Sequence, residues 1–464
     1  MVQGVAIEDG CLVNKNPATG EVISRVPCST AEDVNRMAQN AKDALLAWSE
    51  TPAEDRVRML SEGLQEVAKD ADSIAELIVR EMGKTKAEAT EEMEGATDRK
   101  EYLEILLEAQ KPKKHGSSVV YRQAIGVVAI MSPWNFPVDE ILLLALPALA
   151  AGNTVIVKPS EVAPQCGEAA VKAFEKVLPP NVFQVAQGDG AVGAQLVSHP
   201  LVNLVAMTGS SATGKKILSS AASSLKRVVL ELGGKDPMVV FADSDLDKAA
   251  KDAVEYSVFN AGQVCCAFER VYVEESILSE FEAKCAEYAK EYVVGNGMNP
   301  GVKVGPMVSA MQRDHVIKQV EDAIKDGAKL LFKGDIPSDA PEGSSFYPIT
   351  VLSNVTQEMD IARRETFGPV VSLFKFDGSE AEAVRLANDT EYGLGGSVYT
   401  GDSEKAKRVA SRMFCGQVGI NCYPLMEMNI ACPWVGFGSS GYGYHSGVEG
   451  FQQFSLPKSV VTGS

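Results

Sequence analysis

The chain has 464 residues, of which 45% are hydrophobic and 23% are charged, and its formal net charge at pH 7 is −18. At roughly 150 residues per domain, this length favours two or three globular domains with a sizeable buried core. The excess of acidic residues argues against nucleic acid and anionic membranes as partners, because both bind basic surfaces.

The N-terminal segment 1–17, MVQGVAIEDGCLVNKNP, has no basic region followed by an apolar stretch and is not rich in arginine. It resembles neither a secretory signal nor a transit peptide, so we expect a cytoplasmic protein. The cysteines form no CxxC pair, which is typical of reduced intracellular thiols. No metal site is expected, because the histidines are far apart in the sequence, at His115, His199, His315 and His445.

The first predicted helix covers residues 29–48. Ser29 and Glu32 fit a capping box at its start. Its apolar residues recur at helical spacing, at Val34, Met37, Ala41, Leu45 and Trp48. Helical patterns continue to about residue 108. The longest apolar run, 141–151, is shorter than the roughly 20 residues needed to span a bilayer and is predicted to be a buried helix.

From residue 126 onward, short apolar runs alternate with helical stretches such as 166–177 and 276–292. This alternation predicts right-handed βαβ units and parallel sheets. A second series begins near 237, so we expect two α/β domains that divide near 232–236. The predicted strands are 126–131, 154–157, 182–185, 202–207, 228–232, 237–241, 270–273, 328–332, 347–352, 369–375 and 396–399. Two extended segments, 117–124 and 451–462, are predicted to form a strand arm that pairs outside its own domain.

The first candidate for chemistry is SPWNFP, 132–137, directly after a predicted strand. Ligands of open α/β sheets bind at the carboxyl ends of strands. The two prolines would hold Asn135 in place, and a fixed side-chain amide is a good donor to a developing oxyanion. A turn asparagine beside two prolines is the alternative interpretation.

Two later strands end in KPSE, 158–161, and in MTGSSATGKK, 207–216. Glu161 is suited to bind both ribose hydroxyls of an adenosine and to repel an added 2′-phosphate, with a solvated turn as the alternative. The second motif opens a helix N-terminus, where pyrophosphate binds well. It has the spacing of a P-loop, but Lys216 replaces the Ser or Thr that binds magnesium, so a P-loop is poorly supported.

The last two motifs carry a carboxylate and a pair of thiols. LELGGK, 230–235, places Glu231 at a strand end beside two glycines, where it suits a general base; an acid at a domain hinge is the alternative. FNAGQVCCAFER, 259–270, contains the adjacent Cys265 and Cys266. A thiolate there would be a nucleophile, but no histidine is near in sequence, and two buried structural cysteines are an equal alternative.

Taken together and in this order, these motifs resemble the aldehyde dehydrogenase superfamily of NAD(P)-dependent enzymes. The resemblance covers nearly the whole chain. It implies an α/β fold of two Rossmann-like parallel-sheet domains with a strand-arm oligomerisation element. The matching stretches are PWNFP, ALAAGNTVIVKPSE, MTGSSATGKKI, LELGGKDPMVV, FNAGQVCCAFERVYV, ETFGPVV, NDTEYGLGGSVYT and PWVGFGSSGYG.

The resemblance also implies roles for individual residues. Cys265 is the nucleophile that carries a thiohemiacetal and then a thioester, and Glu231 activates the water that releases the carboxylic acid. Asn135 and the Cys265 backbone N–H stabilise the oxyanion. NAD is the implied cofactor, with NADP as the alternative. The implied cofactor-binding residues are Trp134, Lys158, Ser160, Glu161, Gly190, Gly209, Ser210, Glu365 and Phe367.

The implied domains follow the same resemblance. The NAD-binding domain comprises residues 1–105 and 126–232, and the catalytic domain comprises 233–435. Residues 106–125 and 436–464 form the oligomerisation arm, and a homodimer or homotetramer is expected.

The chain departs from the family pattern at three places. The segment 433–447, PWVGFGSSGYGYHSG, lacks a lysine and an acid that relatives often have there. This change affects the expected subunit contacts and the wall of the substrate tunnel rather than the chemistry. Phe268 is expected to narrow or shift the substrate pocket, and Leu143 replaces a bulky aromatic residue of many relatives.

The sequence does not determine the substrate, and apolar aliphatic or aromatic aldehydes are the default. An acidic helix, 86–98, resembles in position a segment that faces the tunnel mouth in aminoaldehyde dehydrogenases; it contains Glu91, Glu92 and Glu94. A cationic aminoaldehyde such as betaine aldehyde is therefore one alternative, and a solvated helix face is the other reading. A semialdehyde dehydrogenase, a CoA-acylating enzyme and a catalytically idle homologue also remain, although Glu231 argues against the CoA-acylating type.

Overall fold

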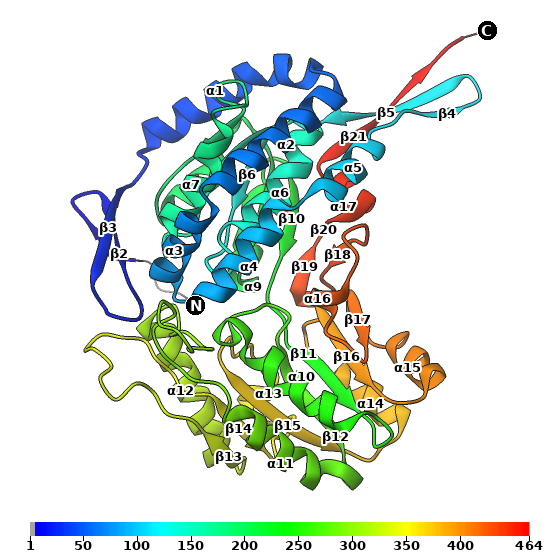
Figure 1. Cartoon of the computed structure of the whole chain (residues 1–464). Coiled ribbons are helices and arrows are strands. Elements are labelled where there is room, and N and C mark those ends of the chain that lie inside the picture. Colours follow the sequence, from blue (N-terminus) through cyan, green and yellow to red (C-terminus); the bar gives the residue numbers. More distant parts are fainter. Residues whose placement is uncertain (1–4, 464) are drawn as a thin grey trace.

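The computed structural model describes residues 5–463 and contains two α/β bodies, built on a six-stranded and a seven-stranded sheet. Figure 1 shows the first body above and the second body below it. Residues 1–4, which begin the segment considered for a targeting signal, and residue 464 lie outside the described residues.

The upper sheet has the strand order β19-β10-β9-β6-β7-β8. The strands β10, β9, β6, β7 and β8 run parallel, and β19 pairs antiparallel with β10. Central parallel strands are covered on both faces and are apolar throughout, as in β6, VVAIM. The bounds are β6 (Val127–Met131), β7 (Thr154–Lys158), β8 (Phe183–Val185), β9 (Val202–Thr208), β10 (Arg227–Glu231) and β19 (Gly441–Tyr442).

Helices cover both faces of this sheet, so alternate residues of β6 enter two different cores. Val128 and Ile130 pack in one core, and Val127 and Ala129 pack in the other. The helices are α1 (Ala31–Glu50), α2 (Ala53–Lys69), α3 (Ala71–Met82), α4 (Lys86–Thr97), α5 (Lys100–Glu108), α6 (Asp139–Ala150), α7 (Pro164–Phe174), α8 (Gly190–Ser198) and α9 (Ser211–Ala222). The apolar run 141–151 forms most of α6, where residues 141–150 are all buried, which confirms the predicted core helix.

The predicted cap of the first helix was wrong by one residue. Thr30 is the N-cap of α1, and it forms a capping box with Asp33. The hydroxyl of Ser29 is not free to cap the helix, because it accepts a hydrogen bond from the backbone N–H of Gln187 at 3.1 Å.

The lower sheet has the strand order β13-β14-β15-β12-β11-β16-β17, in which β13 is antiparallel to β14 and the other neighbours are parallel. Its strands are β11 (Asp236–Val240), β12 (Phe268–Glu274), β13 (Lys329–Lys333), β14 (Thr350–Ser353), β15 (Val370–Phe376), β16 (Gly395–Tyr399) and β17 (Gln417–Ile420). Its helices are α10 (Leu246–Val258), α11 (Leu278–Ala289), α12 (Ala310–Lys325), α13 (Asp360–Arg363), α14 (Glu380–Ala387) and α15 (Ser403–Ala410). The predicted βαβ series in both halves of the chain is confirmed.

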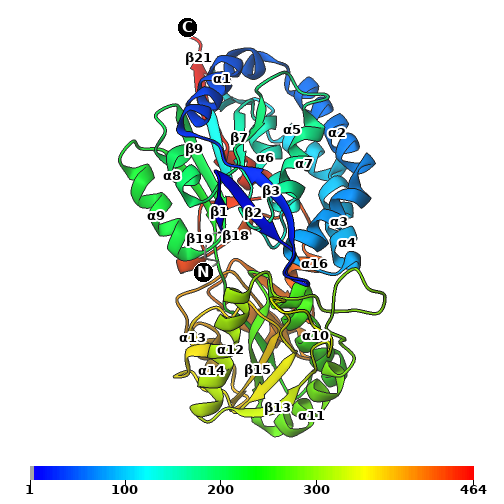
Figure 2. The same cartoon turned by 90° about the vertical axis from the view of Figure 1, so that its left-hand side faces the viewer.

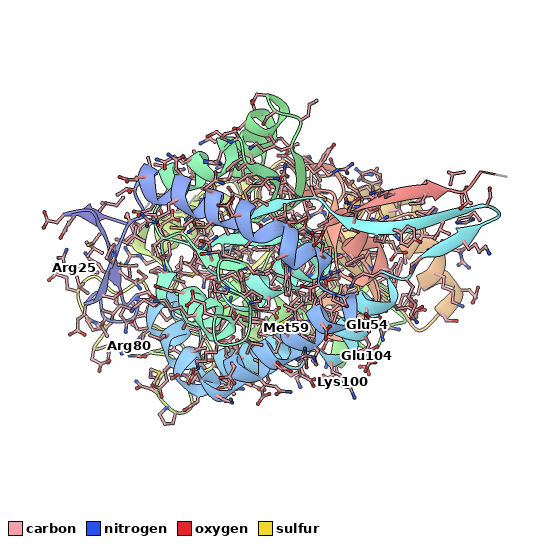
Figure 3. The ribbon with its side chains drawn as sticks, turned by 90° about the horizontal axis from the view of Figure 1, so that it is seen from above. Arg25, Glu54, Met59, Arg80, Lys100 and Glu104 are labelled. Atoms are coloured by element: carbon pink, nitrogen blue, oxygen red, sulfur yellow. The ribbon has the colours of Figure 1, made fainter. Side chains whose placement is uncertain are left out.

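Three small sheets complete the described part of the fold: the two-stranded sheet of β18 (Trp434–Val435) and β20 (Tyr444–His445), an arm and an N-terminal sheet. The arm consists of β4 (Lys113–His115), β5 (Ser118–Ala124) and β21 (Ser455–Val461), in the order β21-β5-β4. The two extended segments thus pair with each other, and the arm projects from the upper body (Figure 1). The N-terminal sheet, β1 (Ile7–Glu8), β2 (Cys11–Lys15) and β3 (Val22–Pro27), crosses the front of the upper body in Figure 2. Seen from above, Arg25 of this sheet and the arm lie on opposite sides of the molecule (Figure 3).

Within residues 5–463, none of the helices combines the length and the apolar character that a membrane crossing requires.

Candidate active site

Four loops that carry predicted site residues are neighbours because their strands are neighbours. The order β10-β9-β6-β7 brings together the strand ends that hold Glu231, Gly209, Asn135 and Lys158. The chain passes from β10 to β11 through residues 232–235, so this edge of the upper sheet faces the lower body. The arrangement follows the rule that open α/β sheets bind ligands at the carboxyl ends of their strands.

The loop that carries Cys265 enters the site from the lower body, between α10 and β12. Asn260, Ala261 and Gly262 all have left-handed φ angles, of 52°, 56° and 69°. An alanine is strained in this region. At Gly262 an added Cβ would lie 2.1 Å from the carbonyl oxygen of Gly368, so the glycine is required. The position of the nucleophile is therefore fixed by a tight turn.

The side chain of Asn135 is joined to the same loop. Its Nδ2 donates to the carbonyl oxygen of Gln263 at 3.1 Å, and Asn260 Nδ2 donates to the carbonyl oxygens of both Asn135 and Gln263, at 3.1 and 3.2 Å. Gln263 is held by the backbone N–H of Val308, which donates to its Oε1 at 2.8 Å. The predicted oxyanion donor thus lies in one network with the residues that precede Cys265.

Glu231 at the end of β10 is 5% exposed and contacts the nucleophile. Its carboxylate accepts a hydrogen bond from the indole Nε1 of Trp434 at 3.3 Å, and it lies close enough to the thiol of Cys265 for each group to shift the pKa of the other. Burial and the charge of Glu140 raise the pKa of Glu231 well above its usual value, and its interactions with Cys265 and Trp434 offset this only in part. A carboxyl group in such surroundings suits proton exchange near neutral pH.

The pKa of Cys265 is also raised well above its usual value, by its contact with the Cys266 thiol, by burial and by the charge of Glu231. Its resting form is therefore the thiol, although the thiolate is the nucleophile. The carboxylate of Glu231 is the proton acceptor in contact with it.

The second cysteine lies in different surroundings. Cys266 is 3% exposed, and its Sγ is 3.1 Å from the hydroxyl of Tyr423. Tyr423 stacks on Tyr256, with ring centroids 4.2 Å apart, and meets Phe268 edge-on at 5.1 Å. Phe268 is 1% exposed, so the expectation that it narrows a substrate pocket is wrong: its ring is enclosed in the core.

Lys158, Ser160 and Glu161 lie together at the end of β7. The Nζ of Lys158 donates to Glu161 Oε2 at 3.2 Å and to the carbonyl oxygen of Gly188 at 2.8 Å. Gly190 begins α8 next to this pair, and a Cβ added to it would meet no atom within 4 Å. The partly exposed carboxylate and the open backbone beside it suit two ribose hydroxyls.

Gly209 and Ser210 connect β9 to α9. Ser210 is the N-cap of this helix and accepts a hydrogen bond from the backbone N–H of Thr213 at 3.3 Å. A helix N-terminus attracts phosphate through its N–H groups and its dipole. A carboxylate for the ribose after β7 and a helix N-terminus for the phosphates after β9, with only β6 between the two strands, form a set of groups that fits an adenine dinucleotide such as NAD.

The remaining predicted cofactor residues gather near Gly234. Trp134 and Phe367 are in edge-to-face contact, with ring centroids 5.4 Å apart. Glu365 Oε1 accepts a hydrogen bond from the backbone N–H of Gly234 at 3.0 Å, and burial with the charge of Glu269 raises the pKa of Glu365 to about 8. Every predicted site residue therefore lies along the edge of the upper sheet or in the loops that face it.

A buried ion pair that supports this site was not predicted. Lys235 pairs with Glu269, whose carboxylate also accepts hydrogen bonds from the backbone N–H groups of Thr366 and Phe367. It thereby holds Phe367 at its left-handed φ of 51°. The sequence did contain a sign of this pair, because Lys235 and Glu269 are charged residues next to or within otherwise apolar strands. Such groups are rarely buried unless they are paired.

The acidic helix is α4, and neither alternative considered for its glutamates, the tunnel mouth or a solvated face, holds for Glu92. Glu92 is 6% exposed, pairs with Lys84 at 2.6 Å and accepts a hydrogen bond from the backbone N–H of Val138 at 3.0 Å. It therefore fixes the start of α6. Glu91 and Glu94 are exposed, as expected if this face of the helix is simply in contact with solvent.

Glu88 on the same helix holds the nucleophile loop. Its Oε1 accepts a hydrogen bond from the backbone N–H of Asn260 at 2.8 Å. Helix α4 thus contacts both the loop before α6, which carries Asn135, and the loop before Cys265.

The chain was compared with known proteins. A family model described as the aldehyde dehydrogenase family matches residues 6–460. The chain is 36% identical to a 3-succinoylsemialdehyde-pyridine dehydrogenase from a Pseudomonas species, over 96% of this chain and 94% of the relative. It is 38% identical to a chloroplastic aminoaldehyde dehydrogenase of Arabidopsis thaliana and 37% identical to a chloroplastic betaine aldehyde dehydrogenase of Amaranthus hypochondriacus, each over 96% of this chain and 91% of the relative.

Solved structures give the same result. A mutant of aldehyde dehydrogenase C from Pseudomonas syringae, in complex with NAD+ and octanal, matches with a TM-score of 0.92 and 34% identity, over 98% of this chain and 94% of that one. The betaine aldehyde dehydrogenase of Staphylococcus aureus in complex with NAD+ matches with a TM-score of 0.92 and 31% identity, over 98% and 92%.

Proposed function

The chain belongs to the aldehyde dehydrogenase family, and on this premise we propose that it oxidises an aldehyde to the carboxylic acid with NAD(P), with Cys265 as nucleophile and Glu231 as general base. The observation that carries the assignment is that the loop of Cys265 packs on the strand end of Glu231: a Cβ added to Gly234 would lie 2.2 Å from the Cys265 carbonyl oxygen, and the charge of the buried Glu231 acts on the Cys265 thiol. This contact also explains why the nucleophile needs no histidine near it in sequence.

In the first half of the reaction, Cys265 Sγ forms a bond to the aldehyde carbon, and its proton passes to Glu231. The negative charge that develops on the aldehyde oxygen is stabilised by Asn135 Nδ2 and by the backbone N–H of Cys265. NAD(P), when bound, accepts the hydride that leaves the aldehyde carbon. The product of this half is a thioester on Cys265.

Before the second half, Glu231 releases the proton of Cys265 to solvent and is again a carboxylate. It then takes a proton from a water molecule as the water oxygen attacks the thioester carbon. The carbon–sulfur bond breaks, and the electron pair returns to Cys265. The carboxylic acid leaves, and the proton held by Glu231 passes to Cys265, which restores the thiol. Each half has a lower barrier than direct oxidation, because the thiol separates hydride loss from hydrolysis.

The hydrolytic reaction is tested by the product. Purified protein incubated with an aldehyde and NAD, without CoA, is expected to form one carboxylic acid per NADH. A panel of neutral and cationic aldehydes at fixed NAD also identifies the substrate class. NADH formation that requires CoA and yields an acyl-CoA would instead establish the CoA-acylating alternative, and no NADH with any aldehyde would favour an idle homologue.

NAD is the proposed cofactor because of Glu161. Its carboxylate, paired with Lys158, would repel the 2′-phosphate of NADP where it would bind the free hydroxyl of NAD. We expect kcat/KM to be at least about tenfold higher with NAD, which corresponds to about 1.4 kcal/mol. Steady-state kinetics with both cofactors measures the ratio, and a clear preference for NADP would refute the assignment.

A cationic aminoaldehyde is the second candidate substrate, because Glu140 places a further carboxylate beside the reacting groups. Glu140 lies on the first turn of α6, its Oε2 accepts a hydrogen bond from Thr208 at 2.8 Å, and its charge acts on both Cys265 and Glu231. Burial and the charge of Asp139 raise the pKa of Glu140 to about 7. An ammonium group on the substrate would compensate this concentration of negative charge.

Replacement of Glu140 with glutamine tests that candidate. We expect KM for a cationic aldehyde to rise about tenfold, and KM for a neutral aldehyde of the same length to change less than about twofold, since only the charge is removed. In the wild type, the preference for a quaternary ammonium aldehyde should increase as the pH rises through about 7, where Glu140 ionises. Equal effects on both substrates would contradict a cation-binding role.

The arm and the edge strands support a homo-oligomer. β17 is the last strand in the order of the lower sheet, and β21 and β4 are the outer strands of the arm. Such edges present backbone groups that pair readily with another chain. The proposal therefore includes a homodimer or homotetramer in which the arm of one protomer reaches its partner.

The proposal also assigns a separate role in the reaction to each of the two α/β bodies. The upper body, 1–105 with 126–232, binds NAD(P), and 233–435 supplies the nucleophile. The cytoplasm is the proposed location, supported by nine cysteines that are all free thiols.

A further inference from the structure

The segment 433–447, in which the sequence departs from the family pattern, folds across the strand end that carries Glu231. Within it, β19 pairs with β10 so that Gly441 lies opposite Glu231. The backbone N–H of Leu232 donates to the carbonyl oxygen of Ser440 at 2.9 Å. The hydroxyl of Ser440 donates to the carbonyl oxygen of Gly233 at 2.7 Å. The segment therefore holds the backbone on both sides of Glu231.

The same segment places an indole against the carboxylate. β18 (Trp434–Val435) pairs with β20 (Tyr444–His445), with Trp434 opposite His445. Their rings are stacked, with centroids 6.5 Å apart and an interplanar angle of 19°. Trp434 and His445 are only 6% and 4% exposed, so the indole has little freedom to move. Its Nε1 donates to Glu231 Oε1 at 3.3 Å.

Glu231 has few other partners. Within residues 5–463, its Oε2 is buried and has no nitrogen or oxygen donor. The titratable groups that act on it are Glu140 on α6, Cys265 on the nucleophile loop and Glu365 on the loop before β15. The two glutamates disfavour its charged form by repulsion, so the indole N–H is the neutral donor that favours it.

We propose that Trp434 is a positioning residue for the general base: its indole N–H, held in place by stacking on His445, donates to the carboxylate of Glu231, stabilises the charged form of that group over the acid and directs it toward Cys265. This inference rests on the proposed function, in which Glu231 is the base. It assigns a role to Trp434 and His445, which the sequence showed only as a departure from the family pattern.

Trp434→Phe tests the proposal, because phenylalanine keeps a planar ring for stacking on His445 and removes the N–H. Without this donor the pKa of Glu231 rises further, so the acid limb of the kcat profile should move up by about one pH unit. At neutral pH kcat should fall about tenfold, and it should recover at higher pH, while KM for the aldehyde changes less than about threefold. The deacylation half is affected most, so a burst of NADH should appear ahead of the slower steady state.

Trp48→Phe is the matched control. Trp48 is also buried, at 2% exposure, and its Nε1 donates to the carbonyl oxygen of Leu149 at 3.1 Å, far in sequence from Glu231. The Trp48→Phe variant loses a comparable hydrogen bond and comparable packing. It should therefore have a lower melting temperature and an unchanged pH profile of kcat. A Trp434→Phe enzyme that loses activity equally at every pH, or only through KM, would show that Trp434 is merely part of the substrate wall.

A measurement on the wild type does not depend on the folding of the variant. The chain has three tryptophans, so its indole N–H groups give three NMR signals in a region free of backbone resonances. The signal of Trp434, identified with Trp48 and Trp134 variants, should shift with pH along the acid limb of kcat and should lose this titration in Glu231→Gln. A Trp434 signal that does not titrate would overturn the inference.

These outcomes also separate the two proposals. If Glu231→Gln turns over at close to the wild-type rate, then the base of the proposed function is wrong. If Glu231→Gln stalls as expected but Trp434→Phe keeps the wild-type pH profile, only the role of Trp434 fails.

Discussion

Replacement of Cys265 with alanine is expected to abolish aldehyde-dependent NADH formation, with kcat lower by on the order of 10⁴-fold or more. Without the thiol there is no thiohemiacetal, and the hydride has no tetrahedral carbon from which to leave. The fold should survive, because Cys265 is half-buried and the turn before it is held by Gly262, Asn260 and Gln263. A spectrophotometric NADH assay and a thermal melt measure the two effects.

Cys266→Ser is the control for this experiment. Cys266 contacts the hydroxyl of Tyr423 at 3.1 Å, and serine can keep that hydrogen bond. We expect its kcat to stay within about threefold of the wild type, since the serine hydroxyl can replace the Cys266 thiol beside Cys265 and Cys266 takes part in no step of the proposed mechanism. Turnover by Cys265→Ala, or its loss in Cys266→Ser alone, would assign the nucleophile to the wrong cysteine.

The regular part of the fold was predictable because buried parallel strands consist of uninterrupted apolar residues. β6 was recognised in this way, and β9 by the same pattern interrupted only by Asn203; the order of strands and helices followed. The short strands β18, β19 and β20 were not predicted. Each has two residues, which is too few for any periodicity, and their pairing depends on how the segment 433–447 folds over β10.

The residues of the candidate site also fall into a group that the sequence predicts and a group that it does not. Residues that would meet a ligand were predictable, because Glu231 and Lys158 stand at strand ends, where parallel strands converge. The residues that hold them were not. Trp434 reaches Glu231 across 203 positions, and Glu92 reaches Val138 across 46. Such contacts depend on tertiary packing, about which local patterns carry no information.

The carboxyl groups around the nucleophile determine the pH range in which the site is expected to be active. Glu231 is buried, Glu140 and Glu365 are partly buried, and each of the three has a raised pKa. Because the charge of Glu231 also raises the pKa of Cys265, the thiol and the base compete for one proton. Activity that needs the Glu231 carboxylate is therefore lost as the pH falls through the raised pKa of Glu231, and kcat should increase with pH across that range.

Glu231→Gln separates the two halves of the reaction. Glutamine has nearly the same shape and still accepts a hydrogen bond from Trp434 Nε1, but it cannot take a proton from water. We expect kcat to fall about 10³-fold, within the range typical of a lost general base, and the acid limb of the pH profile to disappear. Mass spectrometry should detect an acyl group on Cys265, because the thioester forms and is not hydrolysed.

The same substitution predicts a burst. Removal of the Glu231 charge lowers the pKa of Cys265, since that charge is one of the causes that raise it. More thiolate is then present at neutral pH, so the variant can still be acylated, with the thiol proton lost to solvent instead of to residue 231. One NADH per active site should therefore form rapidly before turnover stalls, which a stopped-flow measurement records. A folded Glu231→Gln protein with neither a burst nor an acyl-enzyme would show that Cys265 cannot attack the aldehyde unless Glu231 accepts its proton.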